Sequence, residues 1–173
     1  MRPVLIVDDE PLVRLTLRTS VPWERHGFVY AGEASNGEKA LKALRERPDT
    51  ALVILDLAMP HMNGLEFLRR MAAQGLRPQV IVLSAHDDFP MVREAFKLGV
   101  TDYLLKSEMD PARIEDLLDA AARRIELLGG PAPIASADVS RTAAVKQELL
   151  VRFLSSREPL GLRDEMENWG NSP

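Results

Sequence analysis

Five short apolar runs recur along the chain, and a longer segment with helical spacing of its apolar residues follows each of them. The runs cover residues 4–7, 29–33, 51–55, 79–83 and 101–104. Runs of four or five residues rich in Val, Ile and Leu are typical of β-strands buried on both faces. The pattern therefore predicts five strands.

In the intervening segments, apolar residues lie three or four positions apart, which predicts amphipathic helices. The residues that mark them are Leu12, Leu15 and Thr16; Ala40, Leu41 and Leu44; Leu65, Leu68 and Met71; Val92, Ala95, Phe96 and Leu98; and Ile114, Leu117, Leu118, Ala121 and Ile125. Turn and capping signals bound several of these helices, among them Asn36-Gly37, Gly64, Gly99 and Asp110-Pro111. Five strand–helix units predict an α/β domain with a parallel, doubly wound sheet.

The pattern changes after residue 126. Residues 129–133 read Gly-Gly-Pro-Ala-Pro, which indicates a linker, and residues 139–155 again show helical spacing. We expect a domain at 1–126, a linker at 127–138 and a helical linker or dimerisation segment at 139–173. So short a segment has too little chain to bury Phe153, Leu154 and Trp169 alone.

Composition narrows the functional classes. The chain has 173 residues, 46% of them hydrophobic, and a net charge of −4, which argues against bulk electrostatic binding of nucleic acid. It has no Cys, so disulfides and thiolate metal sites are excluded. No apolar stretch approaches the ~18 residues of a membrane span, so we expect a cytoplasmic protein without membrane contact.

Chemically active side chains follow four of the five predicted strands. Asp8, Asp9 and Glu10 come after the first, Asp56 after the third, Ser84 after the fourth and Lys106 after the fifth. In doubly wound sheets, ligands bind at the carboxyl ends of the strands. The second strand is followed by Glu33-Ala34-Ser35, in which we see no reactive group.

Several carboxylates at one edge of a sheet repel one another unless a cation neutralises them. With oxygen donors and neither His nor Cys, the set suits Mg²⁺ or Mn²⁺. An aspartate beside such an ion can attack phosphorus, and a lysine can stabilise the charge on the transferred group. The pattern indicates that Asp56 is a phosphoacceptor.

Four motifs in this order carry a resemblance to a known family. They are VDDE at 7–10, LDLAMPHMNG at 55–64, VLSAHDD at 82–88 and DYLLK at 102–106. Residues 1–126 resemble the receiver domain of bacterial two-component response regulators. The resemblance implies a flavodoxin-like fold with strand order 2-1-3-4-5, in which a sensor histidine kinase phosphorylates Asp56.

The resemblance also implies roles for the neighbouring residues. Asp9, Asp56 and the carbonyl of Ala58 would hold the metal ion, with Asp8 acting largely through water. Ser84 would be the hydroxyl switch, Lys106 the partner of the phosphate, and Tyr103 the aromatic that reorients with Ser84.

Several positions depart from the family pattern or have ordinary explanations. Ser107 stands where the family usually has a proline, often with a cis peptide bond. Two positions that tune dephosphorylation in the family are occupied by Ala58 and His86. We interpret Glu10 as a first-turn helix acid, and His26, like His61, as a solvated loop residue.

The chain also resembles AraC-type response regulators, well over the predicted receiver domain and only loosely over the later part. The segments WERHGFVYAGEASNGEKAL and KQELLVRFLSS carry that likeness. No DNA-reading element is visible, so we expect a regulator cut before its output domain, or one whose output domain is lost or unusual. Homodimerisation is expected, with DNA bound only through an output domain outside this chain.

Two other functions compete with this interpretation. An Mg²⁺-dependent aspartyl-phosphate phosphatase or phosphotransferase shares the nucleophilic Asp, but it usually has a DxD arrangement where Leu57-Ala58 follow Asp56 here. A pseudo-receiver that dimerises without phosphate is favoured only by Ser107.

Overall fold

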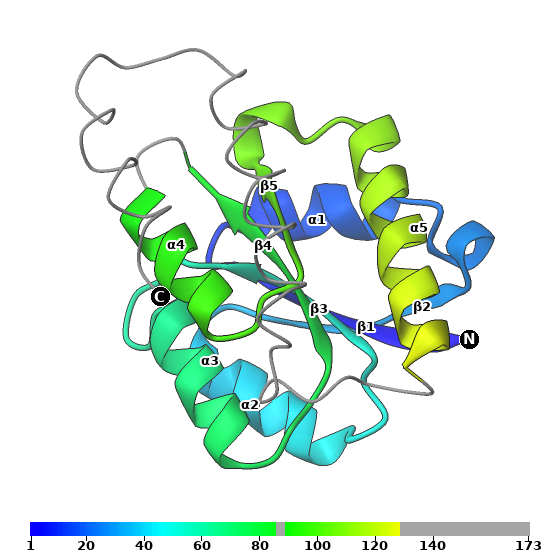
Figure 1. Ribbon diagram of the computed structural model, residues 1–173. Coiled ribbons are helices and arrows are strands. Elements are labelled where there is room, and N and C mark those ends of the chain that lie inside the picture. The colour runs from blue at the N-terminus through cyan, green and yellow to red at the C-terminus, as the bar shows by residue number, and fades with distance from the viewer. Residues whose placement is uncertain (86–88, 129–173) are drawn as a thin grey trace, which may run out of the picture. The chain divides into compact units, whose positions relative to one another are not determined.

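The computed structural model describes residues 1–85 and 89–128, in which five strands alternate with five α-helices (Figure 1). The strands are β1 (Arg2–Val7), β2 (Phe28–Ala34), β3 (Leu52–Asp56), β4 (Gln79–Ser84) and β5 (Asp102–Leu105). The helices are α1 (Pro11–Ser20), α2 (Gly37–Glu46), α3 (Gly64–Ala73), α4 (Phe89–Lys97) and α5 (Pro111–Leu127). Two 3₁₀ turns, η1 (Trp23–His26) and η2 (Lys106–Glu108), complete the described elements.

All five strands are parallel, in the order β2-β1-β3-β4-β5. The predicted fold class and strand order are therefore confirmed. After β1 the chain moves outward to β2 and then crosses to β3 on the other side of β1. The order reverses there, so the carboxyl ends of β1 and β3 border the crevice in which doubly wound sheets bind ligands.

Each face of the sheet is covered by its own helices. Val53 and Leu55 of β3 belong to a core layer packed under α2, α3 and α4, whereas Leu52 and Ile54 belong to a layer packed under α1 and α5. Side chains alternate between the two faces of a strand, so a strand covered on both sides must be apolar at every position. That requirement explains the unbroken apolar runs in the sequence.

The five helices predicted within residues 1–126 all exist, but the buried face of α1 differs from the predicted one. Leu12 and Leu15 are exposed at 72% and 44%, while Leu17 is buried and Val13 is partly buried. Residues 13 and 17 are one helical turn apart, so they share a face. Both faces of α1 carry apolar residues, and only the docking of the helix on the sheet decides which one is buried.

The interpretation of His26 as solvated is wrong. Its side chain is 6% exposed, and its Nδ1 and Nε2 lie 2.6 Å from Asp119 and 3.2 Å from Glu115, both on α5. The polar neighbours of His26 in sequence gave no sign of this, because its partners come about ninety residues later. His61, in contrast, is exposed as expected.

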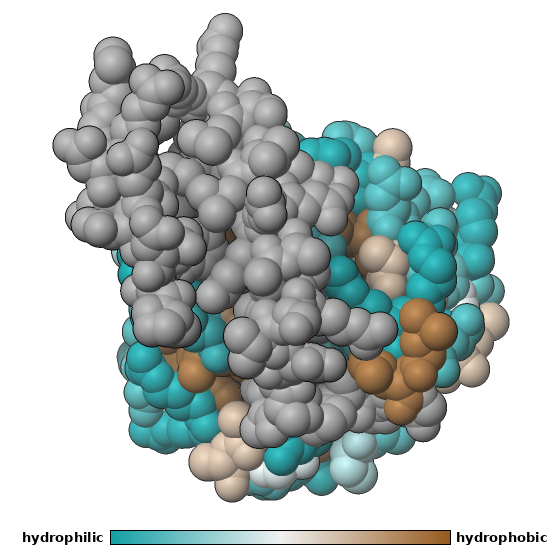
Figure 2. Space-filling view, in the orientation of Figure 1, coloured by the Kyte–Doolittle hydropathy of each residue, from teal (hydrophilic) through white to brown (hydrophobic). Residues whose placement is uncertain are grey.

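The visible face of the described residues is largely hydrophilic, with only small apolar patches (Figure 2). None of the helices in the described ranges is long and apolar enough to cross a membrane. The predicted linker beyond residue 128 and the helical segment at 139–173 lie outside the described residues.

Gly64 fixes the path of the loop that leaves β3. Its N–H donates to the carbonyl of Leu57 at 3.0 Å. A Cβ at Gly64 would lie 2.7 Å from the carbonyl oxygen of Asp56 and 2.8 Å from Cα of Leu57. Both are backbone atoms, which cannot move aside as a flexible side chain can. The chain therefore returns from β3 to α3 directly against Asp56.

We expect Gly64→Ala to lower the free energy of unfolding by about 1–3 kcal/mol, because the added methyl group has to displace the backbone at Asp56. Gly32→Ala is the matched control, since its Cβ would meet only Leu5 at an ordinary 3.8 Å. Chemical denaturation of both variants measures the difference. Equal stability of Gly64→Ala and wild type would contradict the close approach.

Gln79 is a buried polar side chain at the start of β4, and neither its Oε1 nor its Nε2 has a hydrogen-bond partner among residues 1–85 and 89–128. We expect Gln79→Met to raise the free energy of unfolding by about 1–2 kcal/mol, because the replacement removes an unsatisfied amide at similar volume. Denaturant unfolding measures this, with the exposed Gln74→Met as control. A loss of stability for Gln79→Met alone would contradict the prediction.

Candidate functional site

Strand register places two aspartates side by side. In the β1–β3 pair, Ile6 lies opposite Ile54. Asp8 and Asp56 each follow two residues later, so they continue the same face of neighbouring strands, whose backbones lie about 4.8 Å apart. Both carboxyl groups are buried. A shift of one residue in this register would turn one of them to the other face of the sheet.

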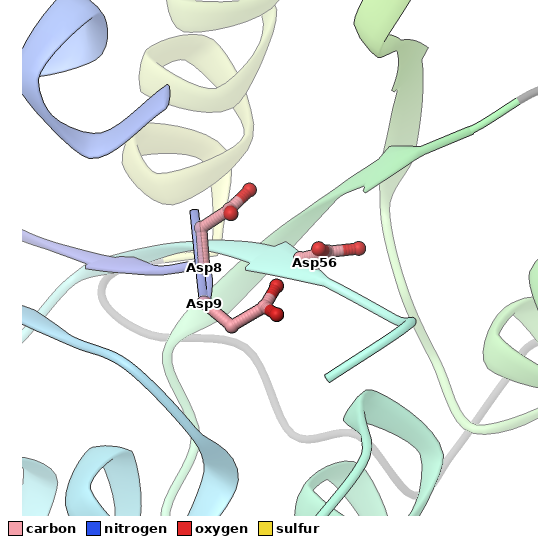
Figure 3. A group of neighbouring side chains, drawn as sticks. All are labelled: Asp8, Asp9 and Asp56. Atoms are coloured by element: carbon pink, nitrogen blue, oxygen red, sulfur yellow. The ribbon is translucent and has the colours of Figure 1, made fainter. Parts of the chain in front are cut away.

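Asp9 joins this pair at the same edge. One carboxylate oxygen from each of Asp8, Asp9 and Asp56 lies within 4.8 Å of the others (Figure 3). In Figure 3 the three side chains stand at the adjacent ends of β1 and β3. The acids that the sequence predicted to converge are thus brought together.

Lys106 supplies the positive charge at this edge. Its Nζ lies 2.7 Å from Oδ2 of Asp56, 2.6 Å from Oε1 of Glu10 and 3.0 Å from Oδ2 of Asp8. It begins the turn η2 directly after β5, so its side chain extends past β4 to reach β3 and β1. The side chain of Lys106 is 17% exposed, and its single ammonium group contacts three carboxylates.

Asp56 is held on both of its oxygens. Oδ1 accepts a hydrogen bond from the backbone N–H of Ala58 at 3.0 Å, and Oδ2 faces Lys106. The neighbouring Ser84 is buried at the end of β4, and its hydroxyl donates to the carbonyl of Ala85 at 2.9 Å. Ser84 would have to break this bond to the backbone of Ala85 before its hydroxyl could donate elsewhere.

Tyr103 lies on β5 and is partly buried against the α2–α4 layer. Its ring meets that of Phe96 on α4 edge to face, with the centroids 6.1 Å apart.

Two further positions that the sequence singled out are His86 and Ser107. His86 lies outside the described residues, and the residues in 1–85 and 89–128 contain no cis peptide bond, so Lys106 and Ser107 are joined in trans.

Sequence reasoning missed the role of Glu10. It is the N-cap residue of α1, but its side chain makes no capping bond there and pairs with Lys106. Its partner lies 96 positions away, so no local sequence signal could have found it. Glu10 is more than half exposed, in contrast to the buried acids beside it.

Burial decides the electrostatics of Asp8. It raises the pKa of the Asp8 carboxyl to about 6, although the hydrogen bond from the Glu10 N–H and the nearby Lys106 act in the opposite direction. Burial also lowers the pKa of Lys106, but its bonds to Asp56, Glu10 and Asp8 outweigh this, and the pKa lies above its ordinary value. Lys106 therefore stays protonated at neutral pH, whereas the carboxyl group of Asp8 takes up a proton as the pH falls toward about 6.

The donor set fits a hard divalent cation. Oδ2 of Asp8 is buried and lies 3.0 Å from Nζ of Lys106. That one ammonium group is shared with Asp56 and Glu10, so it does not neutralise all of the carboxylates at this edge, which repel one another unless a further cation binds. With Asp9 and Asp56 beside it, Asp8 belongs to the all-oxygen environment that Mg²⁺ and Mn²⁺ prefer.

The pKa of Asp8 has a consequence for stability. Because this pKa rises from 3.8 in the unfolded chain to about 6 on folding, the folded state binds more protons in this range, and the contribution of Asp8 to stability falls as the pH rises through 6. Without metal ions at pH 7.5, we expect Asp8→Asn to raise the free energy of unfolding by about 1–3 kcal/mol. The gain should vanish near pH 4.

Denaturant unfolding in the presence of a chelator, at several pH values from 4 to 7.5, measures this difference between variant and wild type. Asp49→Asn, at an exposed carboxylate, is the control and should show no such pH dependence. If Asp8→Asn raised the free energy of unfolding equally at pH 4 and pH 7.5, the raised pKa of Asp8 would be contradicted.

Among curated proteins, the chain is 37% identical over 125 residues to an uncharacterized response regulatory protein of Staphylococcus epidermidis, covering 72% of this chain and 48% of that protein. It is 34% identical over 121 residues to the chemotaxis protein CheY of Thermotoga maritima, covering 69% of this chain and 97% of CheY. The chain thus spans about half the length of the first of these relatives but nearly all of the second.

The fold has close counterparts among solved structures. One is a two-component transcriptional regulator AraC from Clostridium phytofermentans, with a TM-score of 0.66 and 27% identity over 73% of this chain and 97% of that one. The family model described as the response regulator receiver domain matches residues 4–119. These include Asp8, Asp9 and Asp56, which form the acidic site, and Lys106. The chain belongs to the response regulator receiver domain family.

Proposed function

We propose that this protein is a response regulator whose Asp56 accepts a phosphoryl group from a sensor histidine kinase. The observation that carries the proposal is the contact of 2.7 Å between Lys106 Nζ and Oδ2 of Asp56, beside the buried Asp8. Phosphoryl transfer to a carboxylate is favoured by a cation and by neighbouring acids that can hold a metal ion, because both stabilise charge on the phosphoryl oxygens. The family is one of signalling domains, not of classical enzymes.

In the transfer, an oxygen of Asp56 forms a bond to phosphorus, and the bond from phosphorus to the donor's imidazole nitrogen breaks. The electron pair of that bond stays on the nitrogen, and the product is an acyl phosphate on Asp56. Mg²⁺ or Mn²⁺, when bound, would neutralise charge on the phosphoryl oxygens. Asp9, Asp56 and the carbonyl of Ala58 would hold the ion, with Asp8 contributing through water.

Lys106 then exchanges one partner for another. In the resting protein its charge is shared among carboxylates, and after transfer it pairs with a phosphoryl oxygen. Ser84 gives up its bond to the Ala85 carbonyl and donates to the phosphoryl group. Tyr103, packed beside Phe96, follows Ser84. These exchanged contacts supply the difference in free energy that a conformational switch needs.

The output of the switch is proposed from the kind of protein this chain is similar to. The structural neighbour from Clostridium phytofermentans is named as a transcriptional regulator. We infer a homodimer formed in response to phosphorylation in the cytoplasm, which controls transcription through a DNA-binding output domain. The face of α4, β5 and α5, where Tyr103 lies, is the proposed output surface.

Asp56→Asn tests the proposal. After incubation with acetyl phosphate and Mg²⁺, we expect intact-mass spectrometry to find one phosphoryl adduct on wild type and none on Asp56→Asn, because the amide is not a nucleophile toward phosphorus. Size-exclusion chromatography of the same samples should shift toward a dimer for wild type only.

Asp49→Asn, which changes an exposed carboxylate outside the site, should take up phosphate like wild type. An adduct that persists in Asp56→Asn would move the phosphoacceptor elsewhere. The absence of an adduct from wild type would favour a pseudo-receiver, and turnover of a chromogenic phosphate ester would favour a phosphatase.

A further inference from the structure

We propose that Arg14 is a positioning residue for the acidic site, held in place by Glu33, and that it sets the direction of Asp8 and Asp9 toward the metal ion. The inference rests on the proposed function in one respect only, namely that the acidic site binds a divalent cation. Neither residue showed its role in the sequence, where the end of the second strand offered no reactive group.

Arg14 contacts the backbone of both aspartates. Its Nη1 donates to the carbonyl of Asp8 at 2.7 Å and to the carbonyl of Asp9 at 3.2 Å. The side chain is only 14% exposed, so these bonds are shielded from water. On the other side of the same loop, Oδ1 of Asp8 accepts from the N–H of Glu10 at 2.8 Å. The peptide groups that carry the two carboxylates are therefore fixed by Arg14, while Arg14 itself touches neither carboxylate.

Glu33 fixes the guanidinium in turn. Its Oε1 accepts from Nε of Arg14 at 3.2 Å, and its Oε2 accepts from the hydroxyl of Tyr30 at 3.2 Å and lies 3.7 Å from Arg18. Glu33 also offsets the charge of Arg14, so that a cation placed behind the acidic site does not compete with a metal ion in front of it.

An irregularity in the sheet is what allows Glu33 to reach Arg14. Tyr30 pairs with Val4, but Glu33 pairs with Ile6, because the β1–β2 register shifts by one residue between Val4 and Leu5. Val4 and Ile6 both face α1 and α5. In a regular strand, residues 30 and 33 would lie on opposite faces; the extra residue in β2 puts both on the face of α1.

The geometry calls for an arginine at this position. The planar guanidinium presents several N–H groups in a fixed arrangement, so one group can bond to two carbonyls and a carboxylate at the same time. A lysine at position 14 would keep the charge, but its single nitrogen could not make these bonds in the same directions. Supporting residues of this kind typically change metal affinity by about 10–100-fold when they are lost.

Metal affinity distinguishes positioning from a simple effect of charge, because the two predict opposite signs. If Arg14 acted only through its positive charge, its removal would strengthen binding of a cation nearby. If it positions the two aspartates, its removal weakens binding. We expect Arg14→Ala to bind Mn²⁺ about 10-fold more weakly than wild type in a titration followed by electron paramagnetic resonance. Arg14→Lys should also bind more weakly.

Arg70→Ala is the matched control, because it removes the same charge from α3, where Arg70 pairs with Glu66. Its Mn²⁺ affinity should equal that of wild type. Glu33→Gln, which keeps the size of the side chain but weakens its hold on Arg14, should fall between wild type and Arg14→Ala. Cooperative thermal unfolding of each variant checks that a folded domain is being compared.

The rate of phosphorylation by acetyl phosphate gives a second readout. For Arg14→Ala, we expect the concentration of Mg²⁺ that gives half the maximal rate to rise about 10-fold, while the rate at saturating Mg²⁺ stays close to that of wild type. A lower rate at saturating Mg²⁺ with unchanged metal dependence would overturn the proposal.

Unchanged or tighter Mn²⁺ binding by Arg14→Ala would overturn it as well, and so would a wild type that binds no Mn²⁺. These outcomes are separate from a failure of the proposed function. A wild type that binds Mn²⁺ but accepts no phosphoryl group would refute phosphorylation of Asp56 and leave the role of Arg14 to be decided by the metal titration alone.

Discussion

The pairing of one ammonium group with several carboxylates is the interaction on which the rest of this structure depends. Asp8 and Asp56 are buried side by side, and two buried negative charges are tolerated only with a compensating cation. Lys106 provides that charge from the end of β5, which is two strands away from β3 in the sheet. Glu10 adds a further contact to Lys106 from the start of α1. The site joins the ends of β1, β3 and β5. It gathers segments that are about fifty and a hundred residues apart in the chain.

The same arrangement makes the site sensitive to its occupant. Lys106 divides its charge among three acids, so negative charge remains at this edge of the sheet. A divalent cation would neutralise that charge and weaken the need for Lys106 at the carboxylates. A phosphoryl group on Asp56 would then offer Lys106 a stronger partner. The resting geometry therefore already contains the interactions that a phosphoryl group would exchange.

Residues outside the acids contact the backbone segments that carry them. Gly64 allows the loop after β3 to pass directly against Asp56. Arg14 bonds to the carbonyls of Asp8 and Asp9, and the shifted register of β2 turns Glu33 toward Arg14. Each of these features restricts the backbone, which has fewer ways to relax than a side chain. The carboxylates are consequently held close together despite their mutual repulsion.

The sequence by itself determined the five strand–helix units, because strands covered on both faces must be apolar throughout and amphipathic helices must repeat every three or four residues. It also placed Asp8, Asp9, Asp56, Ser84 and Lys106 at one edge of the sheet, since each ends a strand or follows one within two residues. Tertiary structure alone decided the β1–β3 register that aligns Asp8 with Asp56, the buried face of α1, the burial of His26 against α5, and the roles of Glu10, Arg14 and Glu33. Those depend on contacts between residues far apart in the chain or on one extra residue in a strand, and neither leaves a periodic signal in the sequence.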